Sequence, residues 1–304
     1  NALADPPETL PWGVDRIDAD LVWDLDHDLV LDAGANAGGG IKVAVVDTGI
    51  DLDHPDLAEN VKGGVNTINS RKTADDDNGH GSHVAGIIAG VDNTIGVLGV
   101  APRAWLYAVK VLDRNGSGFV SDIIEGIQWC IDNGMQVINM SLGTTSDVQS
   151  FHDAVAAAYQ AGIVVVAAAG NSGPDDNTVL YPAKYPEVIA VSATDSSDAL
   201  ASWSSRGPEV ELAAPGVNVF STYKGGTYAT LSGTSMASPH AAGAAALVLA
   251  SGISDSNGNG TVNDEVRARL QATADDLGDP GRDHLYGYGL VDAEEAATGV
   301  QTAP

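Results

Sequence analysis

Apolar runs of strand length alternate with helical patterns through most of this chain. The strand-like runs are residues 41–46, 105–111, 137–140, 163–168 and 188–191, and the helical patterns are 80–89, 120–133, 151–161 and 235–250. Near-continuous apolar strands separated by helices predict an α/β fold in three layers, with a mostly parallel, twisted sheet between helices. No repeat or linker divides the sequence, so we expect one domain over residues 1–304.

The acidic balance is the second constraint. The chain has 41 acidic and 14 basic residues and a formal net charge of -27. Nucleic acid is excluded as a partner, because phosphate binding needs clustered Lys and Arg. Self-repulsion of this size destabilises a compact chain in dilute buffer, whereas near molar salt, with a Debye length of about 3 Å, it is screened. A halophilic source and ordinary extracellular acidity both explain the charge.

The termini and the single cysteine limit the remaining possibilities. No apolar run reaches the roughly 18 residues of a membrane span, so we expect no membrane partner. Residues 1–7 lack a basic region followed by an apolar stretch and do not form a signal peptide. Either the chain stays in the cytoplasm or it is a mature form whose pro-segment is absent. Cys130 excludes an intramolecular disulfide and fits a packing position in a helix.

Three short segments place reactive side chains beside glycine. Asp47 ends the first apolar strand and precedes Thr48-Gly49, and function in such sheets lies at the carboxyl ends of the strands. Segment 78–86 reads Asn-Gly-His-Gly-Ser-His-Val-Ala-Gly, and segment 233–240 reads Gly-Thr-Ser-Met-Ala-Ser-Pro-His. They put His80 and Ser235 at the starts of predicted helices, with glycine where another group must approach closely.

Together these segments resemble the signatures of the subtilisin-like serine proteases, the subtilase family. The order Asp, His, Ser along the chain also matches that family. The resemblance implies that Ser235 is the nucleophile, that His80 takes its proton and that Asp47 orients and stabilises the imidazole. A metal bound by His80 and His83 is the alternative for these histidines, but no Glu accompanies them in the zinc-protease pattern.

An asparagine after a buried strand supplies a further candidate. Asn171 lies in Ala-Ala-Ala-Gly-Asn-Ser-Gly and should project into the crevice. By resemblance, its amide completes an oxyanion hole with the backbone N–H of Ser235, at a helix N-terminus where the dipole favours negative charge. Without the other motifs, Asn171 would read as an ordinary turn residue.

Two segments resemble the edges that pair with an extended peptide in the family. Recognition by strand addition reads main chain, which implies broad sequence tolerance. Thr144-Thr145 stand where relatives often have a second glycine. The residues of the two edges are Gly116, Ser117, Gly118, Ser141, Leu142 and Gly143.

Calcium is the cofactor that the sequence predicts, because several loops offer oxygen donors to a cation that takes six to eight of them. By resemblance, the first site joins two carboxylates to the loop 91–97. Its ligands are Glu8, Asp56, the side chain of Asn93 and the carbonyls of Val91, Ile95 and Val97.

Two other acidic loops are open to more than one interpretation. Asp75, Asp76 and Asp77 form either a second calcium loop or a solvated acidic run. Loop 255–266 begins like an EF-hand, with glycine sixth, but Val266 stands at the twelfth position, where a bidentate Glu belongs. It either binds calcium in a modified geometry or forms a bare turn. Its candidate ligands are Asp255, Asn257, Asn259, Asp264 and Glu265.

We therefore expect a secreted, calcium-stabilised serine endopeptidase that acts on polypeptides through an acyl-enzyme. The resemblance also implies a monomer whose own pro-segment assists folding and inhibits the enzyme, although intracellular members of the family exist. An esterase with the same triad is one alternative, and the peptide-binding segments argue against it. A catalytically inactive binding module is another, and the presence of all three triad positions and Asn171 argues against that.

Overall fold

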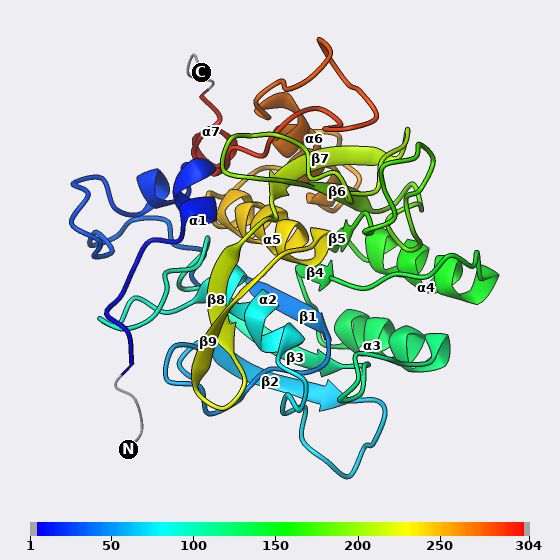
Figure 1. Cartoon of the computed structure of the whole chain (residues 1–304), viewed down its shortest axis with the longest axis horizontal. Coiled ribbons are helices and arrows are strands. Elements are labelled where there is room, and N and C mark those ends of the chain that lie inside the picture. The colour runs from blue at the N-terminus through cyan, green and yellow to red at the C-terminus, as the bar shows by residue number, and fades with distance from the viewer. Residues whose placement is uncertain (1–4, 301–304) are drawn as a thin grey trace.

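The computed structural model describes residues 5–300, and its centre is a seven-stranded parallel sheet (Figure 1). The order of the strands across the sheet is β2-β3-β1-β4-β5-β6-β7. This confirms the predicted α/β class. The strands are β1 (Lys42–Asp47), β2 (Val61–Asn66), β3 (Trp105–Lys110), β4 (Val137–Met140), β5 (Val164–Ala168), β6 (Ile189–Thr194) and β7 (Val210–Pro215).

Helices cover both faces of the sheet, and each face has its own hydrophobic core (Figure 1). Helices α2 (His80–Ala89) and α5 (Thr234–Ala250) pack on one face, and α3 (Val120–Asp132) and α4 (Gln149–Gln160) pack on the other. Strands that are buried on both faces need apolar residues at nearly every position, which explains their continuous apolar runs.

Smaller elements complete the chain around this frame. A hairpin of β8 (Val219–Tyr223) and β9 (Thr227–Leu231) packs its first strand against α2. The remaining elements are α1 (Trp12–Arg16), the 3₁₀-helix η1 (Asp20–Val22), α6 (Asn263–Ala272) and α7 (Ala293–Thr298). Among residues 5–300, no helix combines the length and apolar character needed to cross a bilayer.

Helix α5 passes through the core and is buried on nearly all sides. Its small residues allow this close packing: a Cβ added at Gly243 would lie 2.6 Å from Cβ of Val100. Because α5 is held along its length, its first residues, which include Ser235, are fixed relative to the strand ends.

Two strands of the central sheet, β2 and β7, and both strands of the β8–β9 hairpin were not predicted from the sequence. Strand β7 is fully buried but contains Glu211, whose charge is paired with Arg267 of α6. Strand β2 is a largely exposed edge strand with two glycines, so its sequence lacks an apolar run. Cys130 is a buried packing residue, and burial raises the pKa of its thiol.

Candidate active site

Asp47 and His80 meet at the carboxyl edge of the sheet. Asp47 ends β1 with no exposed surface, and His80 is the first residue of α2. Nδ1 of His80 lies 2.8 Å and 2.9 Å from the two carboxylate oxygens of Asp47. The backbone N–H of Thr48 donates to Oδ1 of Asp47 at 2.7 Å and fixes the carboxylate. This pairing makes Nδ1 of His80 the donor and leaves Nε2 able to accept a proton.

The pKa values of the two histidines in this helix are shifted in opposite directions. Burial lowers the pKa of His80, but the charge of Asp47, its hydrogen bond and the charge of Asp76 outweigh this effect and hold the pKa above its ordinary value. His83 is buried with Nε2 at 3.1 Å and 3.0 Å from the carbonyls of Val219 and Ala229, and burial lowers its pKa to about 4. The two rings therefore face different partners and do not form a metal pair.

A buried carboxylate fixes the start of α2. Asp76 is 6% exposed, and its Oδ1 accepts hydrogen bonds from the hydroxyl of Thr48 and the backbone N–H groups of Asn78 and Gly79. Its Oδ2 accepts from the backbone N–H and hydroxyl of Ser82. Asp76 thus ties the end of β1 to the helix that carries His80.

Ser235 is the second residue of α5 and lines a small crevice of 210 Å³. Its hydroxyl donates to the carbonyl of Ser141 at 3.3 Å. Gly233, two residues before Ser235, has extended backbone, and a Cβ at this position would lie 3.6 Å from both Nδ2 of Asn171 and the backbone N of Ser235. Two N–H donors therefore border one small space beside the serine.

Asn171 is oriented by the residue that precedes Ser235. Its Oδ1 accepts hydrogen bonds from both the backbone N–H and the hydroxyl of Thr234, each at 3.0 Å. The hydroxyl of Thr234 accepts in turn from the backbone N–H of Gly170 at 3.1 Å. With its oxygen engaged in this way, the amide nitrogen of Asn171 is left to face the space beside Gly233.

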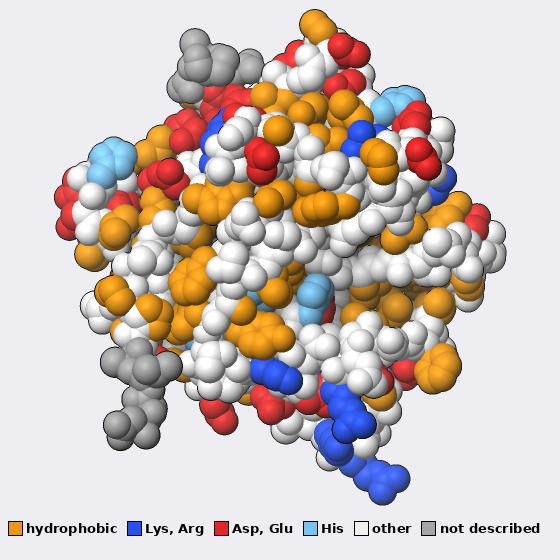
Figure 2. Space-filling view, in the orientation of Figure 1, with side chains coloured by type: hydrophobic (Ala, Val, Ile, Leu, Met, Phe, Trp, Pro, Cys, Tyr) orange, Lys and Arg blue, Asp and Glu red, His pale blue; other side chains and the backbone are white. Residues whose placement is uncertain are grey.

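A second and larger crevice of 540 Å³ holds His80 and both predicted peptide-binding edges. All six edge residues line it, and Ser141, Leu142 and Gly143 line the smaller crevice as well. Figure 2 shows a hollow near the centre of this face, with apolar side chains around it. The loop at 113–118 is held by Asp113, whose Oδ1 accepts from the backbone N–H groups of Asn115 and Ser117.

Several crevice residues were missed by reasoning from the sequence. Val120 and Ile123 could have been found as apolar positions at the start of the helix after the Gly116–Gly118 loop, whereas Leu180 comes from a loop with no recognisable pattern. Leu180 lies close to Gly143 and Gly170 beside Ser235. The residues lining the two crevices that were not predicted are Thr48, Asn78, Leu112, Val120, Ile123, Thr144, Phe151, Ala168, Gly170, Leu180 and Thr234.

The structure brings together the residues of the first predicted calcium site. Oε1 of Glu8 accepts from the backbone N–H groups of Asn93 and Thr94, at 2.7 Å and 3.1 Å. Oδ2 of Asp56 accepts from the N–H of Val97, and its Oδ1 accepts from the side chain of Asn93. Burial, together with the charge of Glu8, raises the pKa of Asp56 to about 7. Two carboxylates that contact the same loop, one of them buried, fit a hard divalent cation.

The other acidic loops differ from each other. Asp75, Asp76 and Asp77 do not converge: Asp75 accepts from the N–H of Leu52, Asp76 caps α2, and Asp77 pairs with Lys110. Each carboxylate of this triplet therefore serves a different segment, and a calcium ion there stays a prediction. Within residues 5–300, Asp24, Asp26 and Asp28 form the one group of three or more His, Cys, Asp or Glu side chains with a ligand atom of each within 4.8 Å of the others, in an alternating pattern that the sequence analysis did not consider.

The loop at 255–265 folds around its own acidic residues. The carboxylate of Asp255 accepts from the N–H groups of Gly258 and Gly260, and Oε1 of Glu265 accepts from Ser256. The side chains of Asn257 and Asn259 both donate to Oδ2 of Asp264. One oxygen each of Asp264 and Glu265 is buried without a hydrogen-bond donor in the described part of the chain. The five predicted ligands therefore lie in one compact loop.

Comparison with known proteins places this site in a family. The model of the subtilase family matches residues 38–289. Subtilisin DY of Bacillus licheniformis is 50% identical over 292 residues, which cover 95% of this chain and 99% of the relative. Subtilisin Savinase of Lederbergia lenta is 48% identical over 289 residues, covering 95% and 99%. A thermostable alkaline protease of Halalkalibacterium halodurans is 49% identical over 296 residues, covering 97% and 76%.

Proposed function

The chain belongs to the subtilase family and is a serine endopeptidase, and we propose that it cleaves polypeptides through an acyl-enzyme formed on Ser235. The observation that carries this assignment is the contact of 2.8 Å between Nδ1 of His80 and the buried carboxylate of Asp47. It leaves Nε2 as the base. His80 lines the larger crevice and Ser235 the smaller one, and the two crevices meet at Ser141, Leu142 and Gly143.

In the first half of the reaction, rotation about χ1 turns the hydroxyl of Ser235 from the carbonyl of Ser141 toward Nε2 of His80. His80 takes the hydroxyl proton while Oγ forms a bond to the scissile carbonyl carbon. The resulting oxyanion is held by the backbone N–H of Ser235 and the amide of Asn171, the two donors beside Gly233. The C–N bond then breaks, and His80 gives its proton to the leaving amine.

In the second half, water replaces the amine. His80 takes a proton from the water, whose oxygen attacks the acyl carbon, and the same two donors hold the second oxyanion. The bond to Oγ then breaks, and His80 returns the proton to Ser235. Throughout the cycle the carboxylate of Asp47 stays ionised and stabilises the imidazolium of His80.

We propose that the substrate lies as an extended strand between residues 116–118 and 141–143. Both edges line the larger crevice, and its apolar wall can take the side chains of the bound peptide. The smaller crevice beside Ser235 then receives the side chain that precedes the cleaved bond. Main-chain pairing gives affinity, and these two crevices give selectivity.

Calcium is proposed as a structural cofactor at two places. Glu8, Asp56, Asn93 and the carbonyls of the 91–97 loop would hold one ion, and the loop at 255–265 would hold another. When bound, the ion neutralises carboxylates that otherwise repel each other and clamps a loop to the body of the protein. It takes no part in the bond-breaking steps.

The domain extent, location, oligomeric state and salt adaptation of the enzyme also belong to the proposal. We propose one peptidase domain over residues 1–304, of which residues 1–4 and 301–304 lie outside the described part. The domain would act outside the cell as a monomer, after its pro-segment has assisted folding and been removed. The net charge of -27 supports adaptation to high salt.

Casein hydrolysis tests this proposal when it is measured across salt and calcium concentrations, with and without a serine-directed inhibitor. We expect cleavage that the inhibitor blocks and that increases with the concentrations of salt and of calcium. Cleavage that resists the inhibitor would contradict the mechanism. Full stability in dilute, calcium-replete buffer would remove the halophilic part and leave the mechanism standing.

A further inference from the structure

A buried ammonium group lies at the carboxyl edge of the sheet, outside the residues that the mechanism uses. Lys110 ends β3, pairs in register with Asp47 of β1 and is 5% exposed. Lysine is almost never buried to this extent unless its charge is compensated. The sequence gives a hint of this position, because Lys110 is a single charge within an otherwise apolar strand.

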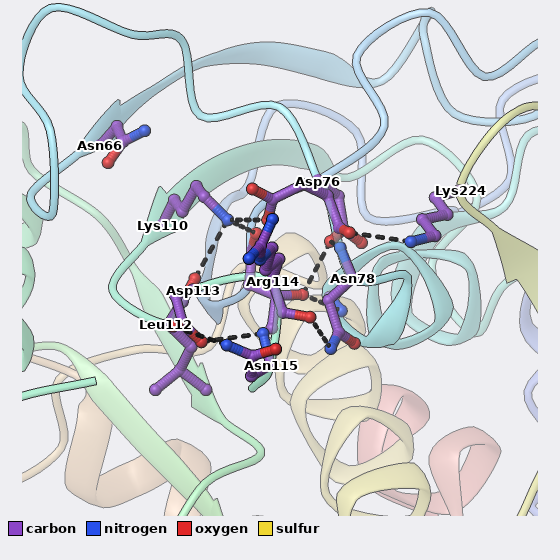
Figure 3. Close-up of polar contacts among 12 residues, drawn as sticks. Asn66, Asp76, Asn78, Lys110, Leu112, Asp113, Arg114, Asn115 and Lys224 are labelled. Carbon is purple, nitrogen blue, oxygen red and sulfur yellow. Dashed lines mark hydrogen bonds and ion pairs between the residues drawn. The ribbon is translucent and has the colours of Figure 1, made fainter. Parts of the chain in front are cut away.

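The ammonium of Lys110 joins three separate segments (Figure 3). Nζ donates to the carbonyl of Thr48 at 2.5 Å, to the carboxylate of Asp77 at 2.7 Å and to the carbonyl of Leu112 at 3.0 Å. An ammonium has three N–H donors, so this set uses all of them. The side chain of Asp77 is 57% exposed, which leaves Lys110 as the buried partner of the pair.

Each of these acceptors belongs to a segment that the reaction needs. Thr48 follows Asp47, and its N–H holds the Asp47 carboxylate. Asp77 lies three residues before His80, in the loop that leads into α2. Leu112 lines the larger crevice and begins the stretch that leads to residues 116–118.

Further hydrogen bonds connect the loop before His80 to the substrate edge on one side and to the β8–β9 hairpin on the other. The side chain of Asn78 donates to the carbonyl of Arg114 at 3.0 Å, next to the substrate edge (Figure 3). From the hairpin β8–β9, Lys224 donates to the carbonyl of Asp77 at 2.8 Å, and Tyr223 donates to that of Asn78 at 3.1 Å. The loop is therefore held between the hairpin and the Lys110 side, and Lys110 is its buried anchor.

We propose that Lys110 is a positioning residue that holds the end of β1, the loop before His80 and the start of the substrate edge in one arrangement. A peptide bound along residues 116–118 then raises the turnover number as well as the affinity, because the edge it touches is rigidly connected to Asp47 and His80. The inference rests on the proposed function of this site. Binding energy from remote parts of a substrate accelerates the chemistry only when the catalytic groups are held in position.

The test compares a dipeptide and a tetrapeptide anilide that share the residue before the cleaved bond, with kcat and KM measured separately. For Lys110→Met, kcat on the tetrapeptide should fall about 10- to 100-fold with KM little changed. The gain in kcat from the two added residues should shrink as well. Lys42→Met is the matched control, because Lys42 lies at the other end of β1 and its Nζ makes an exposed bond to the carbonyl of Asn133. In Lys42→Met, kcat and the increase in kcat from the dipeptide to the tetrapeptide should equal those of the wild type.

A second variant keeps the test decisive if Lys110→Met loses its near-ultraviolet circular dichroism. Asp77→Ala removes the exposed partner of Lys110 and leaves both carbonyl bonds, so it should fold and lower both kcat and the gain by several-fold. The inference would be overturned if folded variants of Lys110 or Asp77 kept the wild-type kcat and the wild-type increase in kcat from dipeptide to tetrapeptide. Fluorophosphonate labelling of Ser235 in the wild type separates the two claims. If Ser235 is not labelled, the proposed function fails. If Ser235 is labelled and the Lys110 and Asp77 variants behave like the wild type, only the role of Lys110 fails.

Discussion

Nδ1 of His80 is within 2.9 Å of both carboxylate oxygens of Asp47, and that carboxylate has no exposed surface. A buried carboxylate beside an imidazole favours the charged ring, which is why the pKa of His80 lies above its ordinary value despite burial. The contact therefore sets both the tautomer of the proposed base and the pH range in which it can act.

The first prediction concerns pH. The base must be neutral, so kcat/KM should fall as pH drops through the raised pKa of His80. Asp47→Asn removes the charge that raises this pKa, so the acid limb should move to lower pH while kcat falls by about 10⁴. Asp53→Asn, an exposed neighbour, is the control and should change neither. An acid limb that stays in place in Asp47→Asn would show that Asp47 does not set the pKa.

The second prediction concerns the oxyanion donor. Asn171→Ala should lower kcat by about 10²–10³ with KM nearly unchanged, because this hydrogen bond forms in the transition state. Ser172→Ala changes the next, exposed side chain of the same loop and should leave kcat unaltered. A large rise in KM at normal kcat would assign Asn171 to substrate binding instead.

The third prediction concerns Leu180 in the small crevice. A Cβ at Gly143 or Gly170 would lie 3.0 Å or less from carbon atoms of Leu180, so this side chain fills space beside Ser235. The enzyme should therefore cleave after medium apolar residues better than after large aromatic ones. Leu180→Gly should raise kcat/KM for a Phe substrate relative to a Leu substrate by about tenfold or more. Equal ratios in the two proteins would exclude Leu180 as a determinant of specificity.

The fourth prediction concerns calcium. Excess chelator should lower Tm, because an ion that binds only the folded state stabilises it by about 2.7 kcal/mol at one hundred times its Kd. Asp56→Asn and Asp255→Asn should each lower Tm in saturating calcium and reduce the further loss on chelation. Asp153→Asn, an exposed change on α4, serves as the control. A Tm that does not respond to chelator would remove both proposed sites.

The sequence was sufficient for the parts of the fold that follow simple periodicity. Helix α2 was predicted with its observed bounds, and β4 likewise, because apolar and small residues make up most of both. Strand β7 was missed because Glu211 interrupts its pattern, and the pairing of that charge with Arg267, 56 residues away, is visible only in three dimensions.

The candidate site divides in the same way. Residue types and order pointed to Asp47, His80 and Ser235, but they gave no sign that Asp76 accepts from the backbone N–H groups at the start of α2. In the same acidic triplet, Asp77 pairs with Lys110, which lies 33 residues further along the chain. Such roles depend on which loops meet at the sheet edge, and short-range patterns do not contain that information.

Labelling of Ser235 tests the central claim most directly. A fluorophosphonate should attach covalently to the folded enzyme at Oγ of Ser235, as mapped by peptide mass spectrometry, and casein hydrolysis should stop in proportion to labelling. Ser235→Ala and His80→Ala should remain unlabelled while keeping the wild-type near-ultraviolet circular dichroism. Casein hydrolysis that persists in Ser235→Ala, or a label on a different residue, would contradict the account.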